Sequence, residues 1–183
     1  MGELKQYTLG SGHLHITELA AETDVNSKEF LDSFFVEGTI LGRIKGGAAF
    51  EYTTEKYEDE DDLGYVVIED ITKEKVTMTS GVMTWNPETL TKLCTTARTT
   101  TEQDGTVTVK IGGLGNQSDK RYVIGFEHKD KKLRVLIVGR NTEGFTFDFK
   151  QDSATVIDCK FRAEASDSEG TLILIKDYRK KTI

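Results

Sequence analysis

Apolar and polar residues alternate with a period of two over several stretches of this chain. The clearest are residues 106–111, 145–149 and 157–164, in which every second residue is apolar. Because successive side chains of a strand point to opposite faces of a sheet, each stretch predicts a strand with one buried face. Residues 133–138 (LRVLIV) are apolar on both faces except at Arg134, which predicts a central strand. Strands of this length, separated by short polar breaks, are typical of a β-sandwich or barrel.

One helix is marked by its start. Asn86 is a good N-cap, and Pro87 suits the first helical position. The apolar residues that follow have helical spacing and form one stripe: Leu90, Leu93, Cys94 and Ala97. A second segment, from Ser27 to Phe35, has the pattern of a short helix, although its end could equally begin a strand. We therefore expect one flanking helix and leave the second segment open.

The segment from Thr39 to Trp85 predicts a long projecting β-hairpin. It contains a long strand (39–53), a very acidic tip, a short strand (65–69) and another strand (75–85), in which Val76, Met78 and Val82 share one face. A ribbon of this length exceeds what a small core can cover. Ribbons that project from a domain usually pair with or pack on a neighbouring subunit, so the pattern indicates self-assembly.

The length and composition agree with a mainly β chain. The 183 residues predict a single domain over 1–183, with residues 39–85 as its extended hairpin. Hydrophobic residues make up 37% and charged residues 30%, which suits a soluble globular protein with a modest core. One proline and 17 glycines fit a chain of hydrogen-bonded strands joined by turns. With no apolar run of about 18 residues and no secretory pattern at the N-terminus, we expect no membrane association.

The net charge argues against one class of partner. The formal charge of −7 disfavours a broad basic face for nucleic acid. Residues 51–62 hold seven acids and one lysine and so contribute −6, which leaves the rest close to neutral. The two cysteines, Cys94 and Cys159, have no metal-ligand spacing and are interpreted as small hydrophobic residues.

Three motifs suggest chemistry, and each has a simpler interpretation. His13 and His15 would share one face of a strand but lack a third metal ligand, so we expect a solvated or interface pair. Residues 113–115 (GLG) lack both the third glycine and the following helix of a dinucleotide site, and we expect a hairpin loop over 112–119. Residues 59–64 match a calcium loop only in part. We find no catalytic constellation, and we predict no enzyme activity, cofactor or metal.

Several stretches together resemble the major tail proteins, or tail tube proteins, of long-tailed phages that infect Gram-positive bacteria. They occur in the expected order and cover most of the chain: LGSGHLHI (9–16), GRIKGGAAFEYT (42–53), SGVMTWNPETLTKL (80–93), VKIGGLGN (109–116), VLIVGRNTEGFTFDF (135–149) and SEGTLILI (168–175). The resemblance implies two packed β-sheets flanked by a helix. It also implies hexameric rings that stack into a tube, with inner strands from all subunits closing one continuous barrel.

The same resemblance implies the partners and the interface. The chain would bind itself, the tape-measure protein, a tail terminator and tail-tip or baseplate proteins, while phage DNA passes through the lumen without specific binding. It would be made in the host bacterial cytoplasm and reside in the virion tail. The hairpin would supply inner-wall strands and an inter-ring loop, so the expected subunit interface comprises Lys45, Gly46, Gly47, Phe50, Tyr52, Tyr57, Glu58, Asp59, Glu60, Asp61 and Asp62.

Two other functions compete with this hypothesis. The inner-tube protein of a contractile tail or injection device would share the architecture and add a surface that binds a sheath. A β-sandwich ligand-binding module, such as a carbohydrate-binding domain, would need an exposed aromatic platform. Trp85 and the tyrosines form no obvious platform in the sequence, and we expect Trp85 to lie in the core beside the helix cap.

Overall fold

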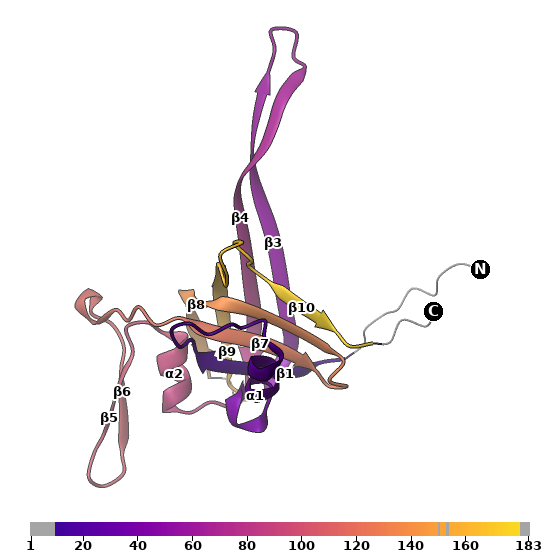
Figure 1. Cartoon of the computed structure of the whole chain (residues 1–183). Helices are drawn as coiled ribbons and strands as arrows, with labels where there is room; N and C mark the ends of the chain where they lie inside the picture. The colour runs from indigo at the N-terminus through magenta and orange to yellow at the C-terminus, as the bar shows by residue number, and fades with distance from the viewer. Residues whose placement is uncertain (1–9, 150, 153, 180–183) are drawn as a thin grey trace.

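The computed structural model describes residues 10–149, 151–152 and 154–179. Over these residues the chain is mainly β, as predicted (Figure 1). In order, the elements are β1 (Gly12–Glu18), α1 (Lys28–Phe34), η1 (Glu37–Thr39, a 3₁₀ helix), β2 (Ile40–Gly42), β3 (Ile44–Glu60), β4 (Val66–Val82), α2 (Pro87–Leu93), β5 (Arg98–Thr101), β6 (Val107–Lys110), η2 (Leu114–Asn116, a 3₁₀ helix), β7 (Tyr122–His128), β8 (Leu133–Asp148), β9 (Val156–Glu164) and β10 (Leu174–Asp177).

One antiparallel sheet contains eight of the described strands. Its order is β2-β1-β7-β8-β9-β4-β3, with β10 also paired to β8, while β5 and β6 form a separate hairpin. β8 pairs with β7 through residues 134–139 and with β9 through residues 138–148. In Figure 1, β3 and β4 run steeply across the direction of β1, β7 and β8. The end strands β2 and β3 do not pair with each other in the described part of the chain, so the sheet is open rather than a closed barrel.

The main core lies between the two parts of this folded sheet. Leu14, Ile124 and Ile137 come from β1, β7 and β8, and they share a buried cluster with Met78 of β4 and Phe161 of β9. α2 adds Leu90 and Leu93 to the same cluster. Burying each such side chain contributes roughly 1.5–3 kcal/mol, so the packed faces hold the sheet in a sandwich-like fold.

α1 covers the opposite face of β7 and β8. Phe34 and Phe35 pack there with Val123, Leu136 and Val138. Gly125 of β7 makes room for both rings, because a Cβ at this position would lie 2.5 Å from Cε1 of Phe34 and 3.0 Å from the ring of Phe35. The position of α1 therefore depends on a missing side chain in the sheet.

A buried ion pair completes this second cluster. Arg134 donates from Nε and Nη2 to Oε1 of Glu127, each at 2.9 Å, and the Glu127 side chain is 4% exposed. The Arg134 guanidinium also lies 4.7 Å from the centre of the Phe35 ring. Such a charge is tolerated in the interior because its partner satisfies it directly. Arg134, the one polar residue of the LRVLIV stretch, thus links the sheet to α1.

Both helices start where the sequence indicates. Asn86 and Thr89 form a reciprocal capping box before α2, and the helix ends at Leu93 because Cys94 is already extended. The predicted stripe therefore continues only as far as Leu93. The segment that the sequence left open is helical: the Ser27 side chain accepts a hydrogen bond from Phe30 N at 3.2 Å and caps α1. The structure thus has two flanking helices in place of one.

The strand predictions are confirmed in the interior and differ at the surface. Residues 133–138 form the centre of the sheet, and the alternation over 157–163 matches the buried face of β9. The stretch 106–111 gives β6, but it pairs only with β5, and Val107 and Ile111 are exposed. Phe149 at the end of its stretch is also exposed. The two strands expected over 65–69 and 75–85 form one strand, β4. It stays paired with β3 throughout, because β-bulges opposite Glu55/Lys56 and Asp59/Glu60 accommodate the extra residues of β4.

Both cysteines are free thiols. Cys159 is buried, and burial raises its pKa to about 12, so the thiol stays protonated. Cys94 is half-buried at the end of α2. The interpretation of these residues as small hydrophobic side chains therefore fits Cys159 well and Cys94 in part.

The packing of α1 gives a first prediction. We expect Gly125→Ala to lower the free energy of unfolding by roughly 1–3 kcal/mol, because the new methyl group overlaps Phe34 and Phe35. Urea denaturation followed by circular dichroism measures the change. Gly38→Ala is the matched control, since a Cβ there meets no atom within 4 Å. Equal stability of the two variants would contradict this account of α1.

His15 gives a second prediction, because it is buried in this cluster. Its side chain is 2% exposed, Nδ1 lies 2.9 Å from Oγ1 of Thr39, and Nε2 has no hydrogen-bond partner among the described residues. Burial lowers the pKa of His15 to about 4, against an opposing effect of the Glu127 carboxylate. Between pH 6.5 and 4 the unfolded chain therefore binds a proton that the folded chain excludes.

We expect stability from this histidine to be complete above pH 6.5 and to be lost as the pH falls toward 4, by up to roughly 3 kcal/mol. Urea denaturation at about pH 7 and about pH 5 measures the loss. His15→Leu should show a smaller difference between the two pH values than the unmodified chain. His13→Leu, at an exposed position of the same strand, should keep most of the difference, because burial lowers the pKa of His15 more than the nearby charge of His13 does. An unchanged pH dependence in His15→Leu would refute this role.

Candidate assembly surface

The β3–β4 ribbon is the most prominent feature of the molecule (Figure 1). Its strands have 17 residues each and pair from Ile44↔Val82 at the foot to Glu60↔Val66 near the tip. β9 pairs with β4 only from Thr77 to Val82. Beyond Val76, both edges of the ribbon are therefore unpaired over the described residues. At about 3.3 Å per residue, this distal part extends roughly 30 Å from the body.

Core packing ends where β9 ends. Met78 and Val76 of β4 are fully buried, and Phe50, opposite Met78, packs against the same core. The next pair on this face toward the tip is Tyr52 opposite Val76, and here the tyrosine side chain is already 54% exposed. Its hydroxyl donates to Oε1 of Glu74 at 2.5 Å, and this hydrogen bond raises the pKa of Tyr52. From here to the tip, the two strands of the ribbon are held to each other by backbone hydrogen bonds and by two ion pairs, Lys56–Glu69 and Lys73–Glu55.

The distal ribbon carries the whole net charge of the chain. Residues 55–74 contain nine carboxylates and two lysines, a sum of −7 that equals the formal charge of all 183 residues. Lys56 pairs with Glu69, and Lys73 pairs with Glu55 at 2.6 Å. Over the described residues, no cation lies within salt-bridge range of the other seven: Glu58, Asp59, Glu60, Asp61, Asp62, Asp70 and Glu74. Like charges this close repel one another, so the isolated ribbon gains little from its own electrostatics.

Apolar side chains are interspersed with these charges. Seven are between 44% and 80% exposed: Tyr52, Tyr57, Leu63, Tyr65, Val66, Ile68 and Ile71. Exposed apolar residues that gather on one projecting element are typical of a surface that binds another protein. The ribbon therefore combines two properties of an interface, unpaired strand edges and unburied apolar area.

The tip itself is an ordered turn. Oδ1 of Asp61 accepts hydrogen bonds from Leu63 N at 2.9 Å and Tyr65 N at 3.0 Å, and Gly64 adopts the positive φ that the turn requires. Asp61 therefore has a structural role in the turn as well as a charge. Leu63, at 80% exposure, and Tyr65, at 67%, are presented outward by this turn.

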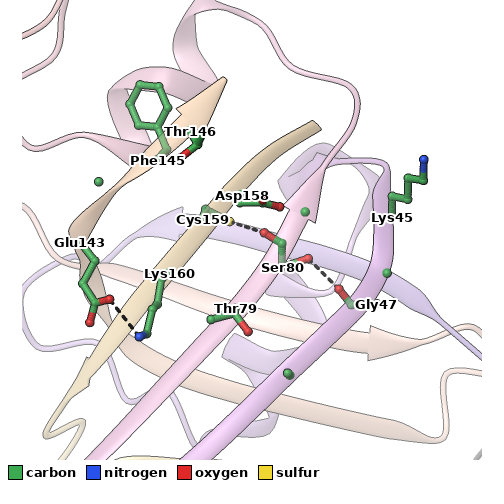
Figure 2. Close-up of a pocket in the computed structure, with 14 residues that line it drawn as sticks. Lys45, Gly47, Thr79, Ser80, Glu143, Phe145, Thr146, Asp158, Cys159 and Lys160 are labelled. Atoms are coloured by element: carbon green, nitrogen blue, oxygen red, sulfur yellow. Dashed lines mark hydrogen bonds and ion pairs between the residues drawn. The ribbon is translucent and has the colours of Figure 1, made fainter. Parts of the chain in front are cut away.

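A hollow of about 450 Å³ lies at the foot of the ribbon (Figure 2). Its floor is formed by small and polar side chains of β4 and β9, including Thr79 and Asp158. One rim is the irregular segment Gly46–Gly47, where Ser80 Oγ donates to the Gly47 carbonyl at 2.9 Å. The other rim holds Glu143, paired to Lys160 at 2.9 Å; this contact lowers the pKa of the Glu143 carboxyl.

The charges in the lining of the hollow cancel. Lys45 and Lys160 balance Glu143 and Asp158 in its lining, so no net charge selects an ionic ligand. In the described part of the chain, no group of three His, Cys, Asp or Glu residues is placed to hold a metal ion. The hollow is a trough of mixed polar and apolar lining, between the irregular strands β3 and β8.

The predicted interface residues fall into three places. Lys45, Gly46 and Gly47 line the hollow, and Phe50 packs inward against the core. Tyr52 and the residues from Tyr57 to Asp62 lie along the exposed ribbon and its tip. The list omitted the apolar partners on the returning strand, such as Ile68 and Ile71. The prediction also left out Glu143 and Lys160, which line the hollow at the foot of the ribbon. The sequence alone could not show this, because strands distant in the chain bring them there.

Two motif interpretations need correction. His13 is exposed, but His15 lies in the core against Phe34 and Phe35, so the two do not form a solvated or interface pair. The loop over 112–119 does not connect a hairpin, because β6 pairs with β5 whereas β7 pairs with β1 and β8. The loop instead crosses from the small hairpin to the main sheet and contains the short turn η2.

An aromatic cluster appears that the sequence did not indicate. Trp85 is 39% exposed and not in the core, contrary to expectation. Its ring lies 5.0 Å from that of Phe147, which stacks at 5.6 Å on Phe149. Phe149 is 75% exposed. We call Trp85, Phe147 and Phe149 the aromatic cluster.

Comparisons with known proteins give structural neighbours only. No family model and no curated protein matches the sequence. One similar structure is the anti-feeding prophage cap (AFP tube terminating cap), with a TM-score of 0.48 and 10% identity over 97% of this chain and 96% of that chain. Another comes from the PVC sheath-tube complex of an extracellular contractile injection system in its extended state, with a TM-score of 0.47 and 9% identity over 94% and 93%. Because both TM-scores are below 0.5, we infer function from the geometry of this chain.

The free ribbon gives a third prediction. We expect that replacing residues 55–73 by an Asn-Gly turn, which joins the facing pair Thr54 and Glu74, changes the free energy of unfolding by less than about 1 kcal/mol. The physical reason is that the removed part packs against nothing in the body. Thermal denaturation followed by circular dichroism measures the effect. Met78→Ala is the control and should cost roughly 2–5 kcal/mol. A large loss in the shortened variant would show that the ribbon supports the fold.

Proposed function

We propose that this chain is a structural virion protein that polymerises as stacked, hexameric rings into the tail tube of a long-tailed phage, through which DNA is delivered. The observation that carries the proposal is the distal β3–β4 ribbon. It is well formed, yet it has free edges, exposed apolar side chains and seven carboxylates without a cation among the described residues. An isolated two-stranded ribbon is marginal in water, so a neighbouring subunit is the natural source of its stability.

The open sheet supports assembly into a ring. Among the described strands, β3 pairs only with β4, so its outer edge presents unpaired backbone groups along a 17-residue strand. A long free edge is a template for pairing with another chain. In a ring of identical copies, the foot of each β3 would pair with the sheet of the next copy, and a barrel closed in this way has no free edge.

The outer face at the foot of the ribbon suits the wall of a channel. The lining of the hollow mixes polar and apolar groups, and its two lysines are balanced by Glu143 and Asp158. Such a wall offers no basic track to which DNA phosphates would bind, so the genome would pass without being held. The tape-measure protein would fill the same lumen before DNA arrives. A tail terminator and tail-tip or baseplate proteins would cap the two ends of the tube.

A second candidate is the inner tube of a contractile tail or injection device. It would need the same rings and, in addition, a surface for the surrounding sheath. The β5–β6 hairpin favours this candidate, since it projects from the body apart from the ribbon, with β5 wholly exposed (Figure 1). The position of the ribbon does not distinguish the two candidates, because it would contact neighbouring subunits in either tube. No described helix is long and apolar enough to cross a membrane, and a tail component requires none.

Assembly gives the fourth prediction. Negative-stain electron microscopy over a concentration series, with size-exclusion chromatography in parallel, should show rings that stack into tubes with a central channel. The variant with the Asn-Gly turn in place of residues 55–73 should remain folded and form no tubes, because stacking requires the ribbon. A chain that stays monomeric at every concentration would contradict the proposed function.

A further inference from the structure

The aromatic cluster is a second exposed apolar surface, distant from the ribbon tip. Its inner member, Phe147, packs against the main core, and Phe145 supports it at 5.3 Å. Its outer members are Trp85 and Phe149, which are 39% and 75% exposed. Phe147 contacts both outer rings and is anchored in the core below, so the cluster forms a rigid, exposed aromatic surface that suits protein binding.

The strand register places the cluster at the opposite end of the same layer from the ribbon tip. Phe147 pairs with Ile157, Ile157 with Val82, and Val82 with Ile44, the first residue of the ribbon. Trp85 follows this row, three residues after Val82. The tip lies beyond Glu60 and Val66, at the far end of β3 and β4.

Charge distinguishes the two ends. Close to the cluster lies Arg43, which donates its backbone N–H to Oγ1 of Thr84 at 2.7 Å, next to Trp85. Arg43 is exposed and has no ion-pair partner over the described residues. The tip presents Asp61 and Asp62 beside Leu63 and Tyr65. Each end therefore offers apolar area flanked by charge, with opposite sign.

We propose that the ribbon tip of one copy binds the aromatic cluster of the next copy along the stack. Leu63 and Tyr65 would pack on Trp85 and Phe149, while the acidic residues of the tip face Arg43. Two different surfaces at opposite ends of one layer give a head-to-tail contact, which extends into a stack instead of closing as a dimer. This inference rests on the proposed function and names the surface that the ribbon contacts.

The test uses two small substitutions at strongly exposed positions. Leu63→Ser at the tip and Phe149→Ser at the cluster should each raise the protein concentration needed for tube formation by about tenfold or more. The double variant should be little worse than either single variant, because both remove the same contact. Leu114→Ser is the matched control at a position that is 92% exposed in η2, and it should assemble normally. Circular dichroism confirms that every variant is folded.

Trp85 supplies an independent readout as the single tryptophan of the chain. Its fluorescence should shift to shorter wavelength on assembly, and acrylamide should quench it less in tubes than in free subunits. Tubes in which Trp85 remains as open to acrylamide as in the monomer would overturn the inference.

The outcomes separate this inference from the proposed function. Normal tubes from both Leu63→Ser and Phe149→Ser would overturn the tip–cluster contact and leave the tube proposal intact. A defect in Phe149→Ser alone would exclude the tip as the occupant of the cluster. Failure of the unmodified chain to form tubes would refute the proposed function itself. In that case, the protein is titrated with oligosaccharides while Trp85 fluorescence is measured. A saturable change would show that the cluster binds sugars, and it would overturn the tip–cluster contact.

Discussion

The arrangement of the whole molecule depends on β8, which pairs with two partners along its length. One half is hydrogen-bonded to β7 and the other to β9, with a register shift between Asn141 and Phe145. This pairing lets one sheet provide both faces of the core, since the strands beyond β9 lie across those beyond β7. Burial of side chains such as Met78 and Phe161 between these faces then stabilises the fold. β9 in turn holds β4, so the direction of the ribbon is set by a strand remote in sequence.

The same constraint explains why the ribbon divides into two parts. Where β9 pairs with β4, from Thr77 to Val82, the ribbon is a layer of the core. Beyond Val76, within the described part of the chain, it has no third strand and a strong excess of acids. Backbone hydrogen bonds between β3 and β4 remain, but they contribute little net stability against the entropy of ordering. The foot therefore belongs to the fold, whereas the distal part requires a partner.

The charge of the distal ribbon affects which surfaces it can bind. The distal ribbon holds the entire formal charge of the chain, and its repulsion opposes pairing between two ribbons. Exposed apolar residues between the charges would otherwise make such pairing favourable. In the proposed stack, contact with a surface that carries Arg43 reverses the sign of the interaction. Like charges would thus keep free subunits apart, and opposite charges would direct them head to tail.

Local patterns in the sequence determined several elements correctly. The cap at Asn86 and Pro87, the central strand over 133–138 and the alternation in β9 each depend on a few neighbouring residues, and each is present in the structure. The ribbon and its acidity were equally evident, because charge and extended conformation are read directly along the chain. The sequence could not choose between helix and strand after Ser27, where a local cap competed with β-favouring residues.

Only the tertiary structure decided which side chains are buried and which distant segments meet. His15 is buried because α1 packs over it, whereas Trp85 stays exposed although its ring contacts Phe147 edge-on. The hollow and the aromatic cluster likewise join residues of β4, β8 and β9 that are far apart in the chain. Periodicity shows which residues share one face of a strand, but their burial depends on which element covers that face. Strand pairing fixes that choice, and strand pairing is a property of the whole fold.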